Sequence, residues 1–317
     1  MPRATLPRLA ITIGDPAGIG PEIVLKAIEM TRSLEYQSMI VGDGEIILAL
    51  ARSLGISLGR RHDIVDTAPT RPVPIGVATA EGGESAWKSI TTATHLCLSG
   101  RADVMVTAPI NKVALDIAGH GSTGHTEILQ ELTGSPWSLT LFVLGDLRAL
   151  FYSRHLSLRD AIDRVSADGI RTVLERFASV APAVGLDNPR IAVAALNPHG
   201  GEGGLFGREE IDHIAPGIEA ARALGIDVHG PIPADAVYAQ AHERRYDVVL
   251  GLYHDQVAGA LKAIDFHGTV SITLGLPFLR FSVDHGTAFD IAGTGRADAA
   301  NMIATIQHAV RFAQRSS

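Results

Sequence analysis

The chain has 317 residues, of which 46% are hydrophobic and 19% charged, and its formal net charge is −7. This composition is typical of a globular protein with a large core, and the length suits two domains or one large α/β domain. The negative charge offers no general surface for polyanions, so nucleic acid is not expected as a partner.

Segments typical of buried strands alternate with helical segments along the chain. Strands are predicted at residues 8–15, 38–43, 102–109, 190–198, 247–255 and 269–277, and helices at residues 21–31, 45–55, 208–225 and 299–315. Pro216 should kink or split the third of these helices. Continuous apolar strands that alternate with helices predict an α/β fold, with a largely parallel sheet covered on both faces.

The middle of the chain has a different pattern. Residues 138–158 contain two apolar runs on either side of Gly145-Asp146, which predicts a β-hairpin and therefore a mixed sheet. No stretch approaches the roughly 20 apolar residues of a membrane helix, and the first residues do not resemble a signal peptide. The single cysteine, Cys97, cannot form an internal disulfide. We therefore expect a cytoplasmic protein that has no membrane partner.

Polar, glycine-rich clusters follow several of the predicted strands. They occupy residues 14–22, 107–112, 196–204, 253–256 and 274–287. Ligands of open α/β sheets bind at the carboxyl ends of strands, so these clusters predict one composite site.

Two segments could bind an anion at a helix N-terminus: the first of these clusters and the separate motif TGHTEIL at residues 123–129. Residues 14–22, GDPAGIGPE, fit either an anion-binding loop or a tight structural turn, and they match neither standard nucleotide fingerprint. In TGHTEIL, Thr123 could cap a helix whose first turn holds His125, Thr126 and Glu127. That turn suits a phosphate, although an ordinary capped helix explains it equally well.

Three of the 13 histidines follow or end apolar strands beside turn residues: His155, His199 and His254. Neutral imidazole is a common ligand of zinc, and three histidines with an open position would make a catalytic metal site. Their spacing matches no short zinc motif, so hydrogen-bonded buried histidines are the alternative. In LNPHGGEGG the glycines around His199 suggest that a ligand comes close to the backbone.

Several charged residues are further candidates. Asp255 could ligate a metal, hold a substrate group or orient His254, and Asp235 could bind substrate or simply cap a helix. Lys262 and Arg280 lie in apolar contexts and need anionic partners, either in an internal ion pair or in a phosphorylated or carboxylated substrate. Residues 282–293 favour a backbone-rich cofactor loop over a hydrolytic triad.

Taken together and in this order, the motifs resemble the 4-hydroxythreonine-4-phosphate dehydrogenase (PdxA) family over essentially the whole chain. The carriers are ITIGDPAGIGPEI, VTAPINK, GHTE, LNPHGGEGGLFGREE, GPIPAD, YHDQ and ITLGLPFLRFSVDHGTAFDIAG. The resemblance implies an isocitrate/isopropylmalate dehydrogenase-like fold with two α/β domains flanking a cleft, in a homodimer. We expect a first domain of residues 1–118 and 296–317. A second domain, of residues 119–295, would hold the metal and substrate site and the dimer interface.

The resemblance also implies roles for individual residues. A divalent metal, zinc before magnesium, manganese or cobalt, would be bound by His155, His199 and His254, the last supplied by the other subunit. A small phosphorylated substrate would be bound by His125, Thr126, Asp235, Asp255, Lys262, Ser271 and Arg280. NAD or NADP would lie near Leu274, Gly275, Asp284, His285 and Thr287.

The implied chemistry is oxidative decarboxylation, with Lys262 as the acid/base candidate and Asp255 as second choice. Ser271 and Phe281 depart from the asparagine and threonine that are usual in the family. The expected substrate is 4-phosphohydroxy-L-threonine, with D-threonate or D-erythronate 4-phosphate as the alternative. A cis-dihydrodiol dehydrogenase, a metal-dependent hydrolase and a non-catalytic binding protein are rival interpretations.

Overall fold

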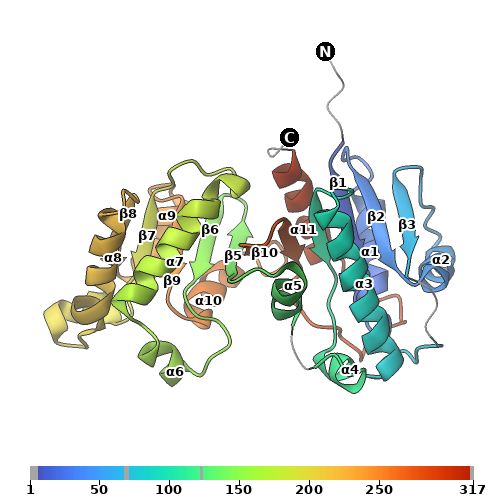
Figure 1. The fold of residues 1–317 in the computed structure, drawn as a ribbon, viewed down its shortest axis with the longest axis horizontal. Helices are drawn as coiled ribbons and strands as arrows, with labels where there is room; N and C mark the ends of the chain where they lie inside the picture. The colour runs from blue at the N-terminus through green and yellow to red at the C-terminus, as the bar shows by residue number, and fades with distance from the viewer. Residues whose placement is uncertain (1–5, 68–70, 122–123, 315–317) are drawn as a thin grey trace, which may run out of the picture. The chain divides into compact units, whose positions relative to one another are not determined.

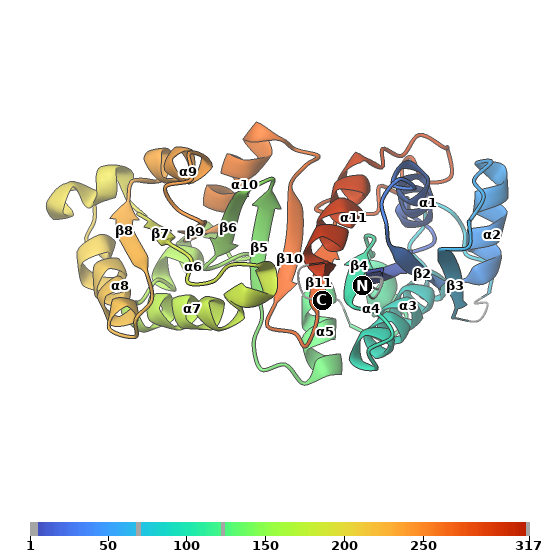
Figure 2. The same cartoon turned by 90° about the horizontal axis from the view of Figure 1, so that it is seen from above.

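The structure is a computed structural model that describes residues 6–67, 71–121 and 124–314. The chain divides into two compact units: unit 1 comprises Met1–Ser138 and Leu276–Ser317, and unit 2 comprises Leu139–Gly275. Each unit contains strands with helices on both faces (Figures 1 and 2). The predicted α/β class is confirmed.

The division differs from the domain limits that we expected, 118/119 and 295/296, and the reason lies in two segments. Helix α5 (His125–Thr133) packs against helix α3 (Ala80–Leu98), and strand β11 (Leu279–Ser282) pairs in parallel with strand β4 (Val104–Thr107). Both segments therefore belong to unit 1. As a consequence, His125 and Arg280 lie in unit 1, whereas the three candidate metal ligands lie in unit 2.

The strands of unit 1 form an all-parallel sheet in the order β3-β2-β1-β4-β11. Its remaining strands are β1 (Arg8–Thr12), β2 (Gln37–Gly42) and β3 (His62–Asp66). In the register, Thr12 pairs with Thr107, and Thr107 pairs with Ser282. Since parallel strands end at the same edge, three hydroxyl side chains come to lie side by side there.

Helices cover both faces of this sheet, as Figure 2 shows, with α1, α2 and α11 on one side and α3, α4 and α5 on the other. The remaining bounds are α1 (Gly20–Met30), α2 (Gly44–Ser53), α4 (Lys112–Ile117) and α11 (Ala300–Ala313). Asp43 caps α2 and Thr79 caps α3 through their side-chain oxygens. The apolar face of α3 packs on the sheet, with Ile90 and Ala93 of the helix in one core cluster with Met105 of β4.

The strands of unit 2 form a mixed sheet in the order β10-β5-β6-β9-β7-β8. Its strands are β5 (Leu139–Leu144), β6 (Leu147–Phe151), β7 (Ile191–Ala194), β8 (Val228–Ile232), β9 (Val248–Gly251) and β10 (Val270–Leu274). Strands β10, β5 and β6 are antiparallel neighbours and the others are parallel. The predicted hairpin at Gly145-Asp146 is confirmed, and Gly145 has a φ of +60°, which favours glycine.

The helices of unit 2 are α6 (Leu158–Asp163), α7 (Ala167–Val180), α8 (Ala215–Arg222), α9 (Ala234–His242) and α10 (His254–Ile264), with short 3₁₀ or π turns at Ala181–Val184, Pro198–Gly204 and Glu210–Ile214. Of these helices, only the one within residues 208–225 was predicted, and α10 begins at His254, inside the strand predicted at residues 247–255. The predicted break at Pro216 is confirmed, because a π turn ends at Ile214 and α8 begins with the proline in its first turn. Within the described ranges, no helix is long and apolar enough to cross a membrane.

Gly83 gives a test of how closely α3 packs on α4. A Cβ atom at Gly83 would lie 2.1 Å from the carbonyl oxygen of Ala114, whereas a Cβ at Gly259 in α10 would meet nothing within 4 Å. We expect Gly83→Ala to lower the free energy of unfolding by about 1–3 kcal/mol. Gly259→Ala should raise it by about 0.5–1 kcal/mol because alanine is the better helix former. Urea denaturation of both variants measures this, and equal effects would contradict the packing.

Candidate active site

Unit 1 holds a buried cation at the carboxyl edge of its sheet. Arg280 of β11 is 6% exposed. Its Nε and Nη2 donate to Thr107 Oγ1 at 3.0 and 2.8 Å, and Nη2 also donates to Ser282 Oγ at 2.8 Å. The two acceptors are the register partners at the ends of β4 and β11. Hydroxyl oxygens fix this side of the guanidinium and leave its positive charge in place, which suits recognition of a phosphate or carboxylate.

His125 lies near this cation and is buried at the start of α5. Burial, reinforced by the positive charge of Arg280, holds the pKa of His125 well below its usual value. The imidazole is therefore neutral at pH 7. Its Nε2 atom is buried and makes no hydrogen bond to any part of the chain that the structure describes. A buried polar atom of this kind needs a partner, and a ligand oxygen would supply one.

The start of α5 differs in detail from the prediction. Gly124 is the N-cap, and its backbone N–H donates to Glu127 Oε2 at 3.1 Å. Thr123, the predicted cap, lies outside the described residues. Thr126 is buried beside His125 in the first turn, as the sequence pattern predicted.

Neighbouring atoms occupy the space around the three glycines of residues 14–22. A Cβ at Gly14 would lie 2.2 Å from Pro109 O, one at Gly18 would lie 2.8 Å from Thr287, and one at Gly20 would lie 2.1 Å from Ile13 O. These approaches support the structural interpretation of this loop over an anion site. Asp15 is fully buried in the same loop, and burial raises the pKa of Asp15 to about 6.

The candidate cofactor residues of unit 1 lie in the long segment between β11 and α11. Thr287 is 8% exposed, and its carbonyl oxygen accepts a hydrogen bond from Ile19 N at 3.0 Å. Asp284 donates its backbone N–H to Asn301 Oδ1 at 2.9 Å. His285 Nδ1 lies 3.0 Å from Gly286 O. This backbone is therefore anchored, while Leu274 and Gly275 belong to unit 2 at the end of β10.

Unit 2 brings two of the three candidate metal ligands together. The rings of His155 and His254 lie 6.2 Å apart, and both line a cavity of about 290 Å³. They follow β6 and β9, which are parallel neighbours. The lining residues are Arg154, His155, Leu156, Leu158, Ala161, Tyr253, His254 and Asp255. His254 Nδ1 lies 2.6 Å from Asp255 Oδ1, and such a carboxylate fixes the imidazole tautomer that leaves Nε2 available as a ligand.

His199 is presented by an unusual backbone. Six consecutive residues, 199–204, have positive φ values between 46° and 101°. Glycine adopts this region freely, whereas His199 and Glu202 are strained there. The side chain of His199 is 70% exposed and lies 3.6 Å from Glu202 Oε1. Within the described part of a single chain, no group of three or more His, Cys, Asp or Glu side chains is placed to hold a metal ion.

A buried carboxylate anchors this strained turn, and the sequence analysis missed it. Glu210 is 3% exposed and its Oε1 accepts hydrogen bonds from Leu196 N at 2.8 Å and Asn197 N at 2.7 Å. Its Oε2 accepts from the Asn197 side chain at 2.9 Å. The buried Glu210 carboxylate therefore fixes the backbone at the start of the turn that presents His199.

The other candidates of unit 2 are spread over its elements. Asp235 is exposed in the first turn of α9, and because Pro233 is the N-cap, the capping interpretation of Asp235 is wrong. Lys262 lies in the last turn of α10, with its Nζ 5.0 Å from the centroid of the Phe266 ring. Eight residues separate it from His254, which is about 12 Å along the helix axis. Ser271 is half-buried in β10.

The depressed pKa of His125 gives a pH test of this arrangement. Below its usual value of about 6.5, the unfolded chain binds a proton that the folded chain refuses, so the free energy of unfolding falls with falling pH. Between pH 7.5 and 5.5, we expect the free energy of unfolding of His125→Gln to fall by about 1 kcal/mol less than that of the wild type. The exposed His242→Gln is the control and should follow the wild type. Denaturant titrations at both pH values measure this, and parallel curves for all three proteins would contradict it.

Comparisons with known proteins agree with this picture. The profile of the family described as "Pyridoxal phosphate biosynthetic protein PdxA" matches residues 21–309. A putative D-threonate 4-phosphate dehydrogenase of Cutibacterium acnes is 43% identical over 97% of this chain and 94% of the relative. The D-threonate 4-phosphate dehydrogenase of Pectobacterium atrosepticum is 40% identical over 96% of this chain and 99% of its own length.

Solved structures show the same relationship. The chain is similar to the crystal structure of 4-hydroxythreonine-4-phosphate dehydrogenase from Klebsiella pneumoniae, with a TM-score of 0.89 and 38% identity. That similarity covers 97% of this chain and 99% of the solved one.

Proposed function

The chain belongs to the PdxA family of dehydrogenases, and on that premise we propose that it oxidises D-threonate 4-phosphate with NAD or NADP as hydride acceptor. Family membership confirms the resemblance that the motifs carry, together with the predicted oxidoreductase class. The proposal goes further by naming a substrate, a cofactor and the residues that act on them.

The single observation that carries the proposal is the buried Arg280 beside His125. A guanidinium held by Thr107 and Ser282, next to a neutral imidazole with an unsatisfied Nε2, matches the oxygens of a phosphorylated acid. This pattern supports a phosphorylated or carboxylated substrate over a neutral diol.

The choice of substrate rests on the relatives. One relative reported above is named D-threonate 4-phosphate dehydrogenase and the other putative D-threonate 4-phosphate dehydrogenase, and for this reason we favour this substrate over the 4-phosphohydroxy-L-threonine that we first expected. The second candidate remains 4-hydroxythreonine 4-phosphate, because the similar Klebsiella structure bears that name. The two substrates differ at one group, a hydroxyl against an amine.

The residues of unit 2 fit a divalent metal. His155 and His254 line one cavity, and Asp255 is placed to orient His254. Imidazole ligands favour zinc over magnesium, with cobalt or manganese as substitutes. A metal bound by these histidines would polarise the substrate hydroxyl and offset negative charge during decarboxylation.

The remaining steps belong to side chains of this chain. We propose that Arg280 and His125 hold the phosphate or carboxylate, with Thr126, Asp235 and Ser271 as further substrate contacts. Lys262 lies far along α10 from His254. It therefore accepts the proton of the substrate hydroxyl through a water molecule. Asp255 is the second candidate for this step.

The electrons leave with the hydride. Oxidation of the alcohol delivers a hydride to the nicotinamide ring and a proton to the base. The β-keto acid that results then loses carbon dioxide. Cofactor binding is proposed for Leu274, Gly275, Asp284, His285 and Thr287.

The first test is reduction of NAD and NADP by metal-loaded protein. We expect absorbance at the wavelength of the reduced cofactor to rise with D-threonate 4-phosphate, and kcat/KM to be at least about tenfold lower with 4-phosphohydroxy-L-threonine. Tenfold corresponds to about 1.4 kcal/mol, as one group swap in a polar site can give. D-Erythronate 4-phosphate is the diastereomeric control. Metal-dependent phosphate release without cofactor reduction would favour the hydrolase interpretation instead.

We further propose that the active form is a homodimer. Beside the His199 turn, Leu205, Phe206 and Ile211 are 75%, 54% and 43% exposed. Large apolar side chains grouped in this way are typical of an interface. Since His155 and His254 already lie together in one chain, the proposed third ligand, His199, comes from the second copy. The alternative allocation is the one that the family resemblance implies, in which His254 is the shared ligand.

Subunit complementation tests the allocation. In a heterodimer of His155→Ala with His199→Ala, one site loses two ligands, while the other keeps all three. We expect this mixture to recover up to about half of the wild-type activity and one metal ion per dimer. A heterodimer of His155→Ala with His254→Ala should recover nothing, because each site lacks one ligand. Recovery in the second mixture alone would show instead that His254 is the shared ligand.

A further inference from the structure

The segment that follows β11 is long for an ordinary connection. Residues 283–299, all of which the structure describes, form neither helix nor strand. They contain Asp284, His285 and Thr287, the proposed cofactor residues of unit 1. Unstructured connections longer than about 12–15 residues in a compact unit are usually functional, and ordering one costs conformational entropy. Contacts at both ends hold this segment in place.

The loop of residues 14–22 supports the first part of the segment. Ile19 N donates to Thr287 O at 3.0 Å, and a Cβ at Gly18 would lie 2.8 Å from both Cβ and O of Thr287. Gly76 contacts both the loop and the segment. Its N–H donates to Ala17 O at 2.8 Å, and a Cβ at Gly76 would lie 2.9 Å from Phe289 O. The small residues of this loop thus allow backbone to pack on backbone.

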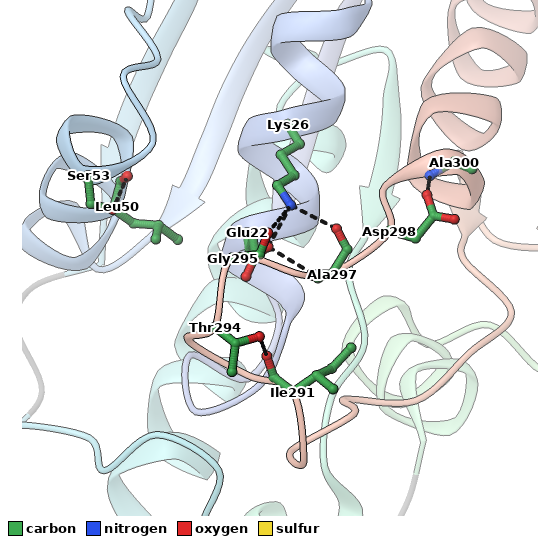
Figure 3. Close-up of polar contacts among 10 residues, drawn as sticks. All are labelled: Glu22, Lys26, Leu50, Ser53, Ile291, Thr294, Gly295, Ala297, Asp298 and Ala300. Atoms are coloured by element: carbon green, nitrogen blue, oxygen red, sulfur yellow. Dashed lines mark hydrogen bonds and ion pairs between the residues drawn. The ribbon is translucent and has the colours of Figure 1, made fainter.

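An ion pair of helix α1 holds the last part (Figure 3). Lys26 Nζ donates to Glu22 Oε1 at 2.7 Å and to the carbonyl oxygens of Gly295 and Ala297, both at 2.9 Å. Glu22 is 3% exposed, and its Oε1 also accepts from Ala297 N at 3.0 Å. All three donors of the ammonium are therefore engaged. The carboxylate neutralises the lysine, so this pair serves as a clamp on the backbone and not as an anion site.

The segment contributes its own turns between these anchors. Thr294 Oγ1 donates to Ile291 O at 2.7 Å, and Asp298 Oδ1 accepts from Ala300 N at 2.8 Å (Figure 3). The first bond lies within the segment, and the second joins it only to the first residue of α11, which follows directly in the chain. Glu22 and Lys26 supply hydrogen bonds that attach Gly295 and Ala297 to α1, beside the packing of Gly293 near Ile75.

We propose that Glu22 and Lys26, together with the packing of Gly18 on Thr287, position residues 284–297 for binding the nicotinamide cofactor. This inference rests on the proposed function, since it assumes that the segment binds NAD or NADP. Glu22 and Lys26 are positioning residues that touch neither substrate nor cofactor. The inference assigns a role to the GDPAGIGPE motif, which the sequence alone left open between an anion loop and a turn.

Lys26→Met tests the clamp, because it keeps an unbranched apolar side chain only one atom shorter than lysine and removes all three donors. We expect about tenfold weaker binding of the cofactor, since a smaller fraction of the protein holds the segment in its binding conformation. The KM for the cofactor should rise by a similar factor, with kcat at saturating cofactor and the zinc content both within about twofold of the wild type. Hydrogen exchange at residues 284–297 should accelerate in the free protein. Lys26→Arg should restore most of the affinity, because a guanidinium can also donate to the carboxylate and a carbonyl.

Arg32→Met is the matched control. Arg32 follows the same helix and likewise joins a carboxylate, Glu29, and a backbone carbonyl, that of Ser57. Its loss should leave cofactor affinity and exchange at residues 284–297 unchanged. Gly18→Ala perturbs the other end of the same segment without any change of charge, and it should also weaken cofactor binding. It can replace Lys26→Met in the test if that variant proves too unstable to purify.

The outcomes are separable. Unchanged cofactor affinity in folded Lys26→Met, with a wild type that binds NAD or NADP, would overturn the inference and leave the proposed function intact. Faster exchange with unchanged affinity would likewise reduce the clamp to a purely structural role. A wild type that binds neither cofactor would overturn the proposed function, and the inference with it.

Discussion

The burial of one positive charge is the constraint on which the unit 1 site depends. A guanidinium can be 6% exposed only where its donors find acceptors, and Arg280 finds two of them in Thr107 and Ser282. Those hydroxyls meet because β4 and β11 are parallel and in register at their last residues. Burial lowers the pKa of His125, the charge of Arg280 lowers it further, and the imidazole stays neutral. Strand register, side-chain chemistry and protonation state are thus consequences of one pairing.

The two units divide the chemistry between them. Unit 1 presents cationic and hydroxyl groups suited to anions, and unit 2 presents imidazoles and carboxylates suited to a metal and to proton transfer. In both units a buried group that carries no proposed chemistry fixes the backbone of a functional segment. Glu210 holds the turn that presents His199, and Glu22 holds the segment that contains Thr287. Removal of such an anchor would alter the site without touching any ligand.

Most of the fold was predictable from the sequence because apolar runs, glycines and prolines have local causes. The hairpin at Gly145-Asp146 and the break at Pro216 followed from such patterns. The edge strands β3 and β8 escaped prediction, since their residues are largely half-exposed and lack a continuous apolar run. Strand β11, which is only four residues long, was also missed, and helices α3, α6, α7, α9 and α10 were not predicted either. The sequence also pointed to the residues of the proposed site, but not to Thr107, Ser282 or Glu210 as their supports. Those contacts depend on which strands become neighbours, and no local pattern encodes that.

The order in which the chain is made has a consequence for how the enzyme assembles. Unit 2 is one continuous stretch inserted into unit 1, whose sheet is completed by a strand that lies after the insertion. During synthesis, unit 2 can therefore fold on the ribosome while β4 still lacks its neighbour β11. Arg280, carried on that last strand, arrives only when the rest of the scaffold exists. The open edge of β4 is meanwhile a place where nascent chains could pair wrongly, so the completion of the unit 1 sheet is a stage at which this protein is exposed to aggregation.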